Sequence, residues 1–216
     1  MHEVQRTRAY LPAAGKDWAL PFYDPMVKLL GGDAARRQLL DQASLAPEQR
    51  VLDIGCGTGT LVALIKRLYP AVDVVGLDPD PKALARAKTK SASAGASIQL
   101  DHGFSDELPY PDASFDRVFS SFMFHHLEAE SREQTVREVR RVLKPGGSFH
   151  LADFVHAGKH GHGLSHRIQS HSHFKDNSDE RILSLMAQAG FARPRKAGDK
   201  TMMFGLLHVA YYAASI

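Results

Sequence analysis

Short apolar, β-rich runs alternate with amphipathic helical patterns from about residue 49 onward. The β-rich runs fall at about 50–54, 72–77, 97–100, 115–120 and 147–153. This alternation is typical of a parallel sheet whose two faces are covered by helices. The nearly continuous apolar character of the fourth run fits a strand buried on both faces. The sequence therefore predicts an α/β fold with one doubly wound sheet.

The helical patterns between these runs carry start and stop signals. Asp80 is a predicted N-cap, and Pro81 follows it at the first helical position, where the missing N–H costs nothing. A later helix is predicted over 131–143, with Ser131 and Gln134 forming a capping box. Basic residues in its last turn match the negative end of the helix dipole.

The two ends of the chain depart from this alternation. Residues 1–48 read as a helical cap, with one helix over 34–46. A helix over 177–189 is closed by Gly190. Two β-like runs follow it, with a turn predicted around residues 198–200; they cover about 193–198 and 204–213. This spacing suits an antiparallel hairpin at the edge of the sheet.

Composition narrows the class of protein. The chain has 216 residues, 44% of them hydrophobic and 24% charged, which is the composition of one soluble globular domain. The net charge of +3 is spread along the chain and does not form the basic cluster of a nucleic-acid binder. The single cysteine, Cys56, excludes an internal disulfide and a Cys-rich zinc site. We find neither a secretory signal pattern nor an apolar run long enough to span a bilayer, and therefore expect a cytoplasmic protein.

A glycine-rich segment follows the first predicted strand and opens a helix. It reads Asp53-Ile54-Gly55-Cys56-Gly57-Thr58-Gly59. The dinucleotide-binding spacing would require glycine at position 60, where Thr60 stands. The Asp53 carboxylate would repel a pyrophosphate at this helix start but would attract a cationic ligand group.

A second acid refines the choice of ligand. Asp78 ends the next strand, where a carboxylate accepts hydrogen bonds from ribose hydroxyls. The two acids together call for an adenosine-like ligand with a cationic far end and no phosphates. S-adenosylmethionine fits this description. The alternatives at each position are that Asp53 caps the loop backbone and that Asp78 is only a helix N-cap.

Four ordered segments resemble the motifs of class I S-adenosylmethionine-dependent methyltransferases, and the small ubiquinone/menaquinone-type or "type 11" enzymes are the most similar subgroup. The segments lie between residues 47 and 155, and they are Val51–Leu61, Gly76–Asp80, Leu108–Asp116 and Leu143–Gly147. The resemblance implies a Rossmann-like seven-stranded sheet of order 3-2-1-4-5-7-6, with the last strand antiparallel, and an N-terminal helical cap. It implies a single methyltransferase domain over 1–216, in which residues 49–153 form the cofactor-binding half, 154–176 a His-rich lid and 177–216 the C-terminal helix and hairpin.

The resemblance also implies roles for individual residues. Asp53 would lie near the amino group of the methionine half, and Asp78 would hold the ribose. Phe104 stands where relatives often have an acid that reads the adenine, so contact there is by stacking or through the backbone. The other implied cofactor-binding residues are Gly55, Cys56, Gly57, Gly59, Pro79, Ser105 and Ser120, the last beneath the reactive methyl. Within the loop, Cys56 reads as a small buried residue and not as a nucleophile.

Methyl transfer is an in-line displacement in which the enzyme mainly orients the reactants and excludes water. An oxygen or nitrogen acceptor also needs a base, and His125 or His126, just after the fourth strand, are candidates. The alternative is a histidine that bonds the backbone at a helix start. Ser120–Met123 stands where nucleic-acid amine methyltransferases carry an Asn/Asp-Pro-Pro-aromatic motif, so a small-molecule acceptor is expected, with no nucleic-acid partner. Candidate wall positions are Trp18, Phe22, Tyr23 and Phe174.

Six of the twelve histidines fall between residues 156 and 173. Three interpretations stay open: a solvated flexible lid, a lid that supplies a base or binds an anionic acceptor, and a metal site with Asp176 or Asp179. No acid cluster completes a metal shell, so no metal is predicted. The rival functions are a non-catalytic adenosylmethionine-binding regulator and a nicotinamide-dependent oxidoreductase. We expect a monomer or a homodimer.

Overall fold

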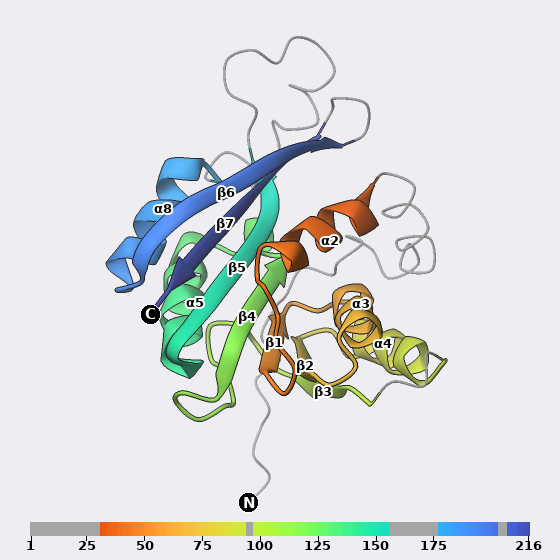
Figure 1. Cartoon of the computed structure of the whole chain (residues 1–216). Coiled ribbons are helices and arrows are strands. Elements are labelled where there is room, and N and C mark those ends of the chain that lie inside the picture. The colour runs from red at the N-terminus through yellow and green to blue at the C-terminus, as the bar shows by residue number, and fades with distance from the viewer. Residues whose placement is uncertain (1–30, 94–96, 156–176, 203–206) are drawn as a thin grey trace, which may run out of the picture.

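Seven strands form one mixed sheet of order β3-β2-β1-β4-β5-β7-β6 (Figure 1). The computed structural model describes residues 31–93, 97–155, 177–202 and 207–216. The strands are β1 (Arg50–Ile54), β2 (Asp73–Asp78), β3 (Gln99–His102), β4 (Phe115–Ser121), β5 (Leu143–Val155), β6 (Ala192–Met202) and β7 (Leu207–Ser215). The first five strands run parallel, and β7 is antiparallel to both β5 and β6. This confirms the predicted Rossmann-like fold and its strand order.

Helices cover both faces of this sheet (Figure 1). On one face lie α2 (Gly32–Asp41), α3 (Thr60–Leu68) and α4 (Pro81–Ser93). On the other face lie α5 (Ala129–Val142) and α8 (Asp179–Gln188), and a short 3-10 helix, η2 (Phe124–His126), follows β4. Each helix buries an apolar stripe against the sheet, as the amphipathic patterns predict.

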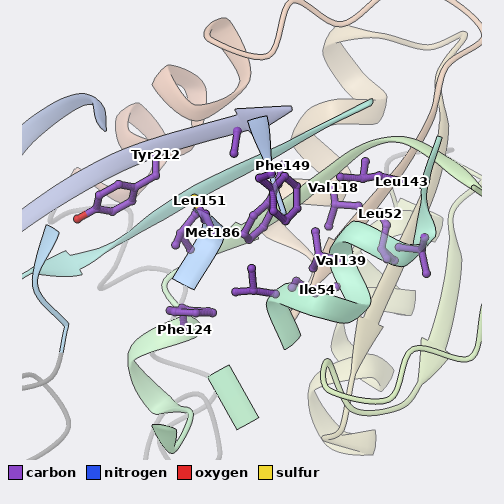
Figure 2. Packing of buried hydrophobic residues seen from close by; sticks show 14 of the residues in the cluster. Leu52, Ile54, Val118, Phe124, Val139, Leu143, Phe149, Leu151, Met186 and Tyr212 are labelled. Atoms are coloured by element: carbon purple, nitrogen blue, oxygen red, sulfur yellow. The ribbon is translucent and has the colours of Figure 1, made fainter. Parts of the chain in front are cut away.

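The sheet divides the core into two layers. The layer under α5 and α8 includes Leu52, Val118, Val139, Phe149 and Met186, all fully buried (Figure 2). The layer under α2 and α3 includes Leu39, Ile65, Phe119 and Tyr211. Because alternate strand residues face opposite layers, each strand reads as an almost continuous apolar run. The carboxyl ends of the parallel strands lie at one edge of this core, where open α/β sheets bind their ligands.

Several predicted boundaries were wrong. The hairpin turn is not at residues 198–200, because β6 continues to Met202 and pairs with β7 through Asp199 and Lys200. A register shift between Lys196 and Gly198 absorbs the glycine that suggested a turn. The third strand ends at His102, two residues beyond the predicted end.

The capping predictions had mixed outcomes. Asp80 caps α4 as predicted, since its Oδ1 accepts the Lys82 N–H at 2.8 Å. The predicted capping box at Ser131 was wrong, because α5 already begins at Ala129 with Glu128 at its N-cap. Ser178 caps α8, so this helix begins at Asp179 and not at residue 177.

Several predicted features lie outside the described residues. These are the first 30 residues of the cap, the four aromatic wall positions, and the His-rich stretch with Asp176. In the part of the chain that the structure describes, no helix is long and apolar enough to cross a membrane.

Candidate functional site

A fully buried carboxylate ends the first strand. Asp53 is 1% exposed, and neither of its oxygens makes a hydrogen bond with the described residues. Burial raises the pKa of Asp53 to about 8, although the charge of Arg36 opposes this shift. A buried acid without partners is costly. Its predicted alternative role as a cap for the loop backbone is therefore not observed, and the carboxylate is available to a ligand.

Arg36 reaches this region from α2 on the same face of the sheet. The residue is only 6% exposed, and its Nε makes no hydrogen bond with the described residues. Its guanidinium lies 5.4 Å from the centre of the Phe122 ring. Sequence reasoning missed Arg36, because in the helical pattern over 34–46 it reads as an ordinary polar position. Its burial follows only from the docking of α2 against β5.

The glycine loop places its backbone where side chains would not fit. Gly55 has φ +68°, and a Cβ there would lie 2.3 Å from Met123 Cγ. Phe122, just after β4, adopts φ +59°, which is rare for a bulky residue. Gly59 has φ +78° immediately before α3, and a Cβ there would clash with Ala87. The loop therefore depends on glycine for both conformation and space.

Asp78 anchors this loop from the end of β2. Its Oδ2 accepts the Gly57 N–H at 2.8 Å, and its Oδ1 accepts the Asp80 N–H at 2.9 Å. Burial raises the pKa of Asp78, and the two backbone hydrogen bonds oppose that shift. Each carboxylate oxygen has two lone pairs, so both can still accept from a ribose diol. Asp78 is thus more than the simple helix N-cap of the alternative interpretation.

Cys56 lies within the loop as a buried thiol. Its side chain is 8% exposed, and burial raises its pKa well above the ordinary value. A thiol held in its neutral form is a poor nucleophile. Its Sγ also lies 3.0 Å from the position of a Cβ on Gly76. These contacts agree with the predicted packing role.

The end of β3 carries the other predicted cofactor contacts. Gly103 N–H donates to the Asp78 carbonyl at 3.2 Å, so Phe104 and Ser105 follow directly beside the end of β2. Ser105 is buried, and its hydroxyl lies 2.9 Å from the Thr135 hydroxyl. Pro79 accepts a hydrogen bond at its carbonyl from the His102 ring at 3.0 Å.

Ser120 is the predicted residue that the fold separates from Asp53. Asp53 is paired with Phe119, so these two side chains share a face of the sheet. Ser120 is the next residue along β4 and is paired with Leu151, so it faces the layer under α5. It is fully buried, and its hydroxyl has no hydrogen-bond partner among the described residues.

The two candidate catalytic histidines follow β4 in η2. His125 is 5% exposed; its Nδ1 lies 2.5 Å from one oxygen of Asp153, and its N–H donates to the other at 2.6 Å. His126 is half-buried, and its ring centre lies 4.0 Å from that of His125. Sequence reasoning missed Asp153, although an acid inside the apolar run Leu151–Val155 was a usable signal. The His125 ring bonds the Asp153 carboxylate through Nδ1.

This arrangement presents two kinds of group at the carboxyl edge of the sheet. Arg36 offers a positive charge and Asp53 a carboxyl group that a cationic partner would ionise, both in a low-dielectric setting, which suits a zwitterion such as an amino acid. Asp78 offers oxygen acceptors one strand away. Among residues 31–93, 97–155, 177–202 and 207–216, no group of three or more potential ligands could hold a metal ion.

This chain is similar to known methyltransferases. The family described as "Methyltransferase domain" matches residues 51–147. Demethylmenaquinone methyltransferase of Thermus thermophilus is 34% identical over 151 residues, which is 68% of this chain and 68% of that protein. The 27-O-demethylrifamycin SV methyltransferase of Amycolatopsis mediterranei is 36% identical over 122 residues, 55% of this chain and 43% of that protein. The chain therefore spans from under half to about two thirds of these two relatives.

Solved structures share the fold. Phosphoethanolamine N-methyltransferase 2 of Haemonchus contortus, in complex with S-adenosyl-L-methionine, has a TM-score of 0.76 at 18% identity, covering 93% of this chain and 57% of that one. A SAM-dependent methyltransferase from Aquifex aeolicus has a TM-score of 0.70 at 18% identity, covering 93% and 98%. With the four motifs, the sheet order and the Thermus relative in agreement, this chain belongs to the class I S-adenosylmethionine-dependent methyltransferases of the ubiquinone/menaquinone type.

Proposed function

We propose that this protein transfers the methyl group of S-adenosylmethionine to a small-molecule acceptor, with Asp53 and Arg36 holding the methionine half of the cofactor. The observation that carries this proposal is the buried Asp53 carboxyl group, which makes no hydrogen bond with the described residues and lies near the buried Arg36. The cofactor's ammonium would pair with Asp53 and its carboxylate with Arg36. Asp78 would accept from the ribose hydroxyls.

When bound, S-adenosylmethionine supplies an electrophilic methyl group on a sulfonium, and the protein's contribution is orientation. The glycine loop and the residues after β4 position the two reactants, and the apolar core beneath them excludes water. Gly55, Gly57, Gly59 and Cys56 would line the methionine half, with Pro79, Phe104 and Ser105 toward the adenine. We propose that Ser120 lies near the methyl group because it stands near the end of β4. Its side chain faces the layer under α5 and would not contact the methyl group.

His126 is the proposed base for an acceptor that must lose a proton. It is half-buried, whereas His125 is only 5% exposed, so it is the more accessible of the two histidines. His125 is instead a positioning residue, because Asp153 fixes both its ring and its backbone N–H. The Asp153–His125 pair in turn supports the His126 ring that lies against it.

The acceptor class follows from the relatives. Two relatives are named as methyltransferases of demethylmenaquinone and of 27-O-demethylrifamycin SV, both small molecules. We therefore propose a small ring-containing acceptor with an ionisable hydroxyl or an activated carbon. We also propose that the protein is a monomer or a homodimer and that it is cytoplasmic. We further propose that the chain divides into a helical cap, a cofactor-binding half, a His-rich lid, and a C-terminal helix and hairpin.

Calorimetric titration with S-adenosylmethionine, S-adenosylhomocysteine and NAD tests the cofactor site. Binding of both adenosyl compounds without binding of NAD is the expected result, and failure of both to bind overturns the proposal. Transfer is then followed by mass spectrometry with a trideuteromethyl donor and reduced demethylated quinones as acceptors. Binding without transfer to any acceptor of a broad panel would favour the non-catalytic regulator.

A further inference from the structure

A buried histidine on the α2 face of the sheet has an unpaired ring nitrogen. His150 of β5 is 4% exposed, and its ring stacks on Phe119 with 5.5 Å between the ring centres. Its Nε2 lies 2.8 Å from the Ser148 hydroxyl, whereas its Nδ1 is buried without a hydrogen-bond partner among the described residues. Buried polar atoms are normally hydrogen-bonded, because leaving one unpaired costs free energy. The Nδ1 atom therefore indicates a ligand.

Two arginines lie on either side of this histidine on the same face. His150 is paired with Ala213 of β7, and Ala213 is paired with Arg195 of the edge strand β6. Paired residues share a face, so only the small Ala213 side chain separates His150 from Arg195 in this row. Arg117 on β4 is two residues before Phe119, so its side chain lies on this face as well. Burial, together with the positive charges of the two arginines, lowers the pKa of His150 to about 3.

The acceptors near these cations are already engaged. Arg117 donates from Nε to the Ala43 carbonyl at 3.2 Å and from Nη1 to the Asp116 carbonyl at 2.8 Å. The Asp116 carboxylate accepts from Lys144 Nζ and from the Arg50 N–H, each at 2.8 Å. Within the part of the chain that the structure describes, neither arginine beside the histidine forms an ion pair with a carboxylate. The cluster is therefore rich in donors and positive charge and lacks an anion.

We propose that this protein binds an oxyanion of the phosphate class between Arg117, His150 and Arg195. In the tautomer that carries its proton on Nδ1, His150 donates to the anion while its Nε2 accepts from the Ser148 hydroxyl. A guanidinium presents two parallel N–H donors that match two oxygens of a phosphate. Arg195 is exposed on the edge strand, so the anion would enter from solvent on that side.

This oxyanion site is separate from the site proposed for S-adenosylmethionine. Asp53, Phe119 and His150 follow one another in one row of the sheet, so the Phe119 ring lies between the other two side chains. S-adenosylmethionine carries no phosphate. Binding of an oxyanion here therefore does not depend on the proposed methyl transfer.

Thermal unfolding and titration calorimetry with inorganic phosphate test the site, with sodium chloride at equal ionic strength as the reference. Phosphate should raise the melting temperature saturably, with a dissociation constant of about 1 mM or lower, because it binds the folded state. In ¹⁵N NMR spectra, His150 should carry its proton on Nδ1 when phosphate is present. Equal stabilisation by phosphate and chloride, or an Nδ1 without a proton in saturating phosphate, would overturn the proposal.

Three variants locate the binding. Arg195→Gln changes an exposed side chain and should weaken phosphate binding by about tenfold or more. Lys200→Gln removes the same charge from the same strand and face, where Lys200 is paired with Val209, and should stay within about twofold of the wild type. His150→Phe keeps a ring against Phe119 and should abolish saturable binding. Equal weakening in Arg195→Gln and Lys200→Gln would reduce the effect to net charge and contradict the site.

A phosphomonoester distinguishes two sources of the anion. If glycerol 3-phosphate binds about tenfold more tightly than inorganic phosphate, the site takes the phosphate group of a larger molecule. If it binds equally or more weakly, the site takes the free ion. If neither compound binds saturably, the proposal is wrong, and the cofactor titrations of the proposed function are unaffected.

Discussion

Asp53 is an acidic residue held in an environment that disfavours its charged form. Its pKa is about 3.8 in an unfolded chain and about 8 in the folded protein, because burial disfavours the charged form. The folded state therefore binds this proton more tightly than the unfolded state does. The stability that protonated Asp53 contributes is fully present below about pH 4 and is lost as the pH rises through about 8.

Asp53→Asn should therefore separate stability from binding. The amide cannot ionise, so the difference in melting temperature between the variant and the wild type should grow in the variant's favour from pH 6 to pH 8.5. Affinity for S-adenosylhomocysteine should fall about 10- to 100-fold at pH 8, because the partner of the ammonium is lost. Differential scanning calorimetry and titration calorimetry measure the two effects. A difference in melting temperature that stays constant with pH would contradict the buried-acid assignment.

His126→Ala tests the division of labour between the two histidines. Loss of a general base should lower turnover about 10²- to 10⁴-fold, with the affinity for S-adenosylhomocysteine within about threefold of the wild type. The readouts are single-turnover transfer to an identified acceptor and calorimetric titration. His208→Ala, on β7, is the matched control and should leave both unchanged. Unchanged turnover in His126→Ala would return this residue to a packing role.

At the scale of the elements, α5 holds the segment that leads into β4. Arg141 donates to the carbonyls of Tyr110 and Leu108 at 2.7 and 3.0 Å and also pairs with Asp112. Glu138 accepts the Leu108 N–H at 2.8 Å. The motif at 108–116 that resembles the family's is therefore fixed in place by the last turns of a helix. These basic residues do more than complement a helix dipole.

Arg141→Ala should lower the free energy of unfolding by about 1–3 kcal/mol, since several hydrogen bonds to a charged group are lost at a half-buried position. Arg137→Ala, one turn earlier, is the matched control. Its ion pair to Glu133 is 3.9 Å long and exposed, so removing the Arg137 side chain should cost less than about 0.5 kcal/mol. Urea unfolding of both variants gives the comparison. Equal losses would show that the Arg141 contacts do not stabilise the fold.

At the scale of the whole molecule, a bound cofactor should stabilise the packing of α2 on the sheet, because it would contact both Arg36 on α2 and Asp53 on β1. A ligand at one hundred times its dissociation constant stabilises by about 2.7 kcal/mol, or roughly 5–10 °C in a domain of this size. We therefore expect S-adenosylhomocysteine to raise the melting temperature by that amount and NAD to leave it unchanged. Arg36→Met, which keeps the apolar stem, should show a smaller rise at the same ligand concentration. A full rise in that variant would remove α2 from the cofactor site.

The sequence by itself determined the sheet and the location of its ligand edge. Periodicity placed every strand, because a parallel sheet buries both faces and leaves continuous apolar runs. Asp53, the glycines and Asp78 were also visible, since a carboxylate and glycines at strand ends have few structural uses. Element ends were less certain, as with the turn at residues 198–200, where pairing along β7 outweighed the local turn preference of a glycine.

Only the tertiary structure decided which residues meet. Arg36 is one polar position among several in a helix, and it joins the proposed site only because α2 packs against β5 and brings it near Asp53 and Phe122. The pairing of His125 with Asp153 joins residues 28 positions apart, which no local pattern encodes. Ser120 was placed at the correct strand end, but the pleat turned its side chain to the other face. Short-range preferences fix elements, whereas contacts between elements depend on how the faces pack.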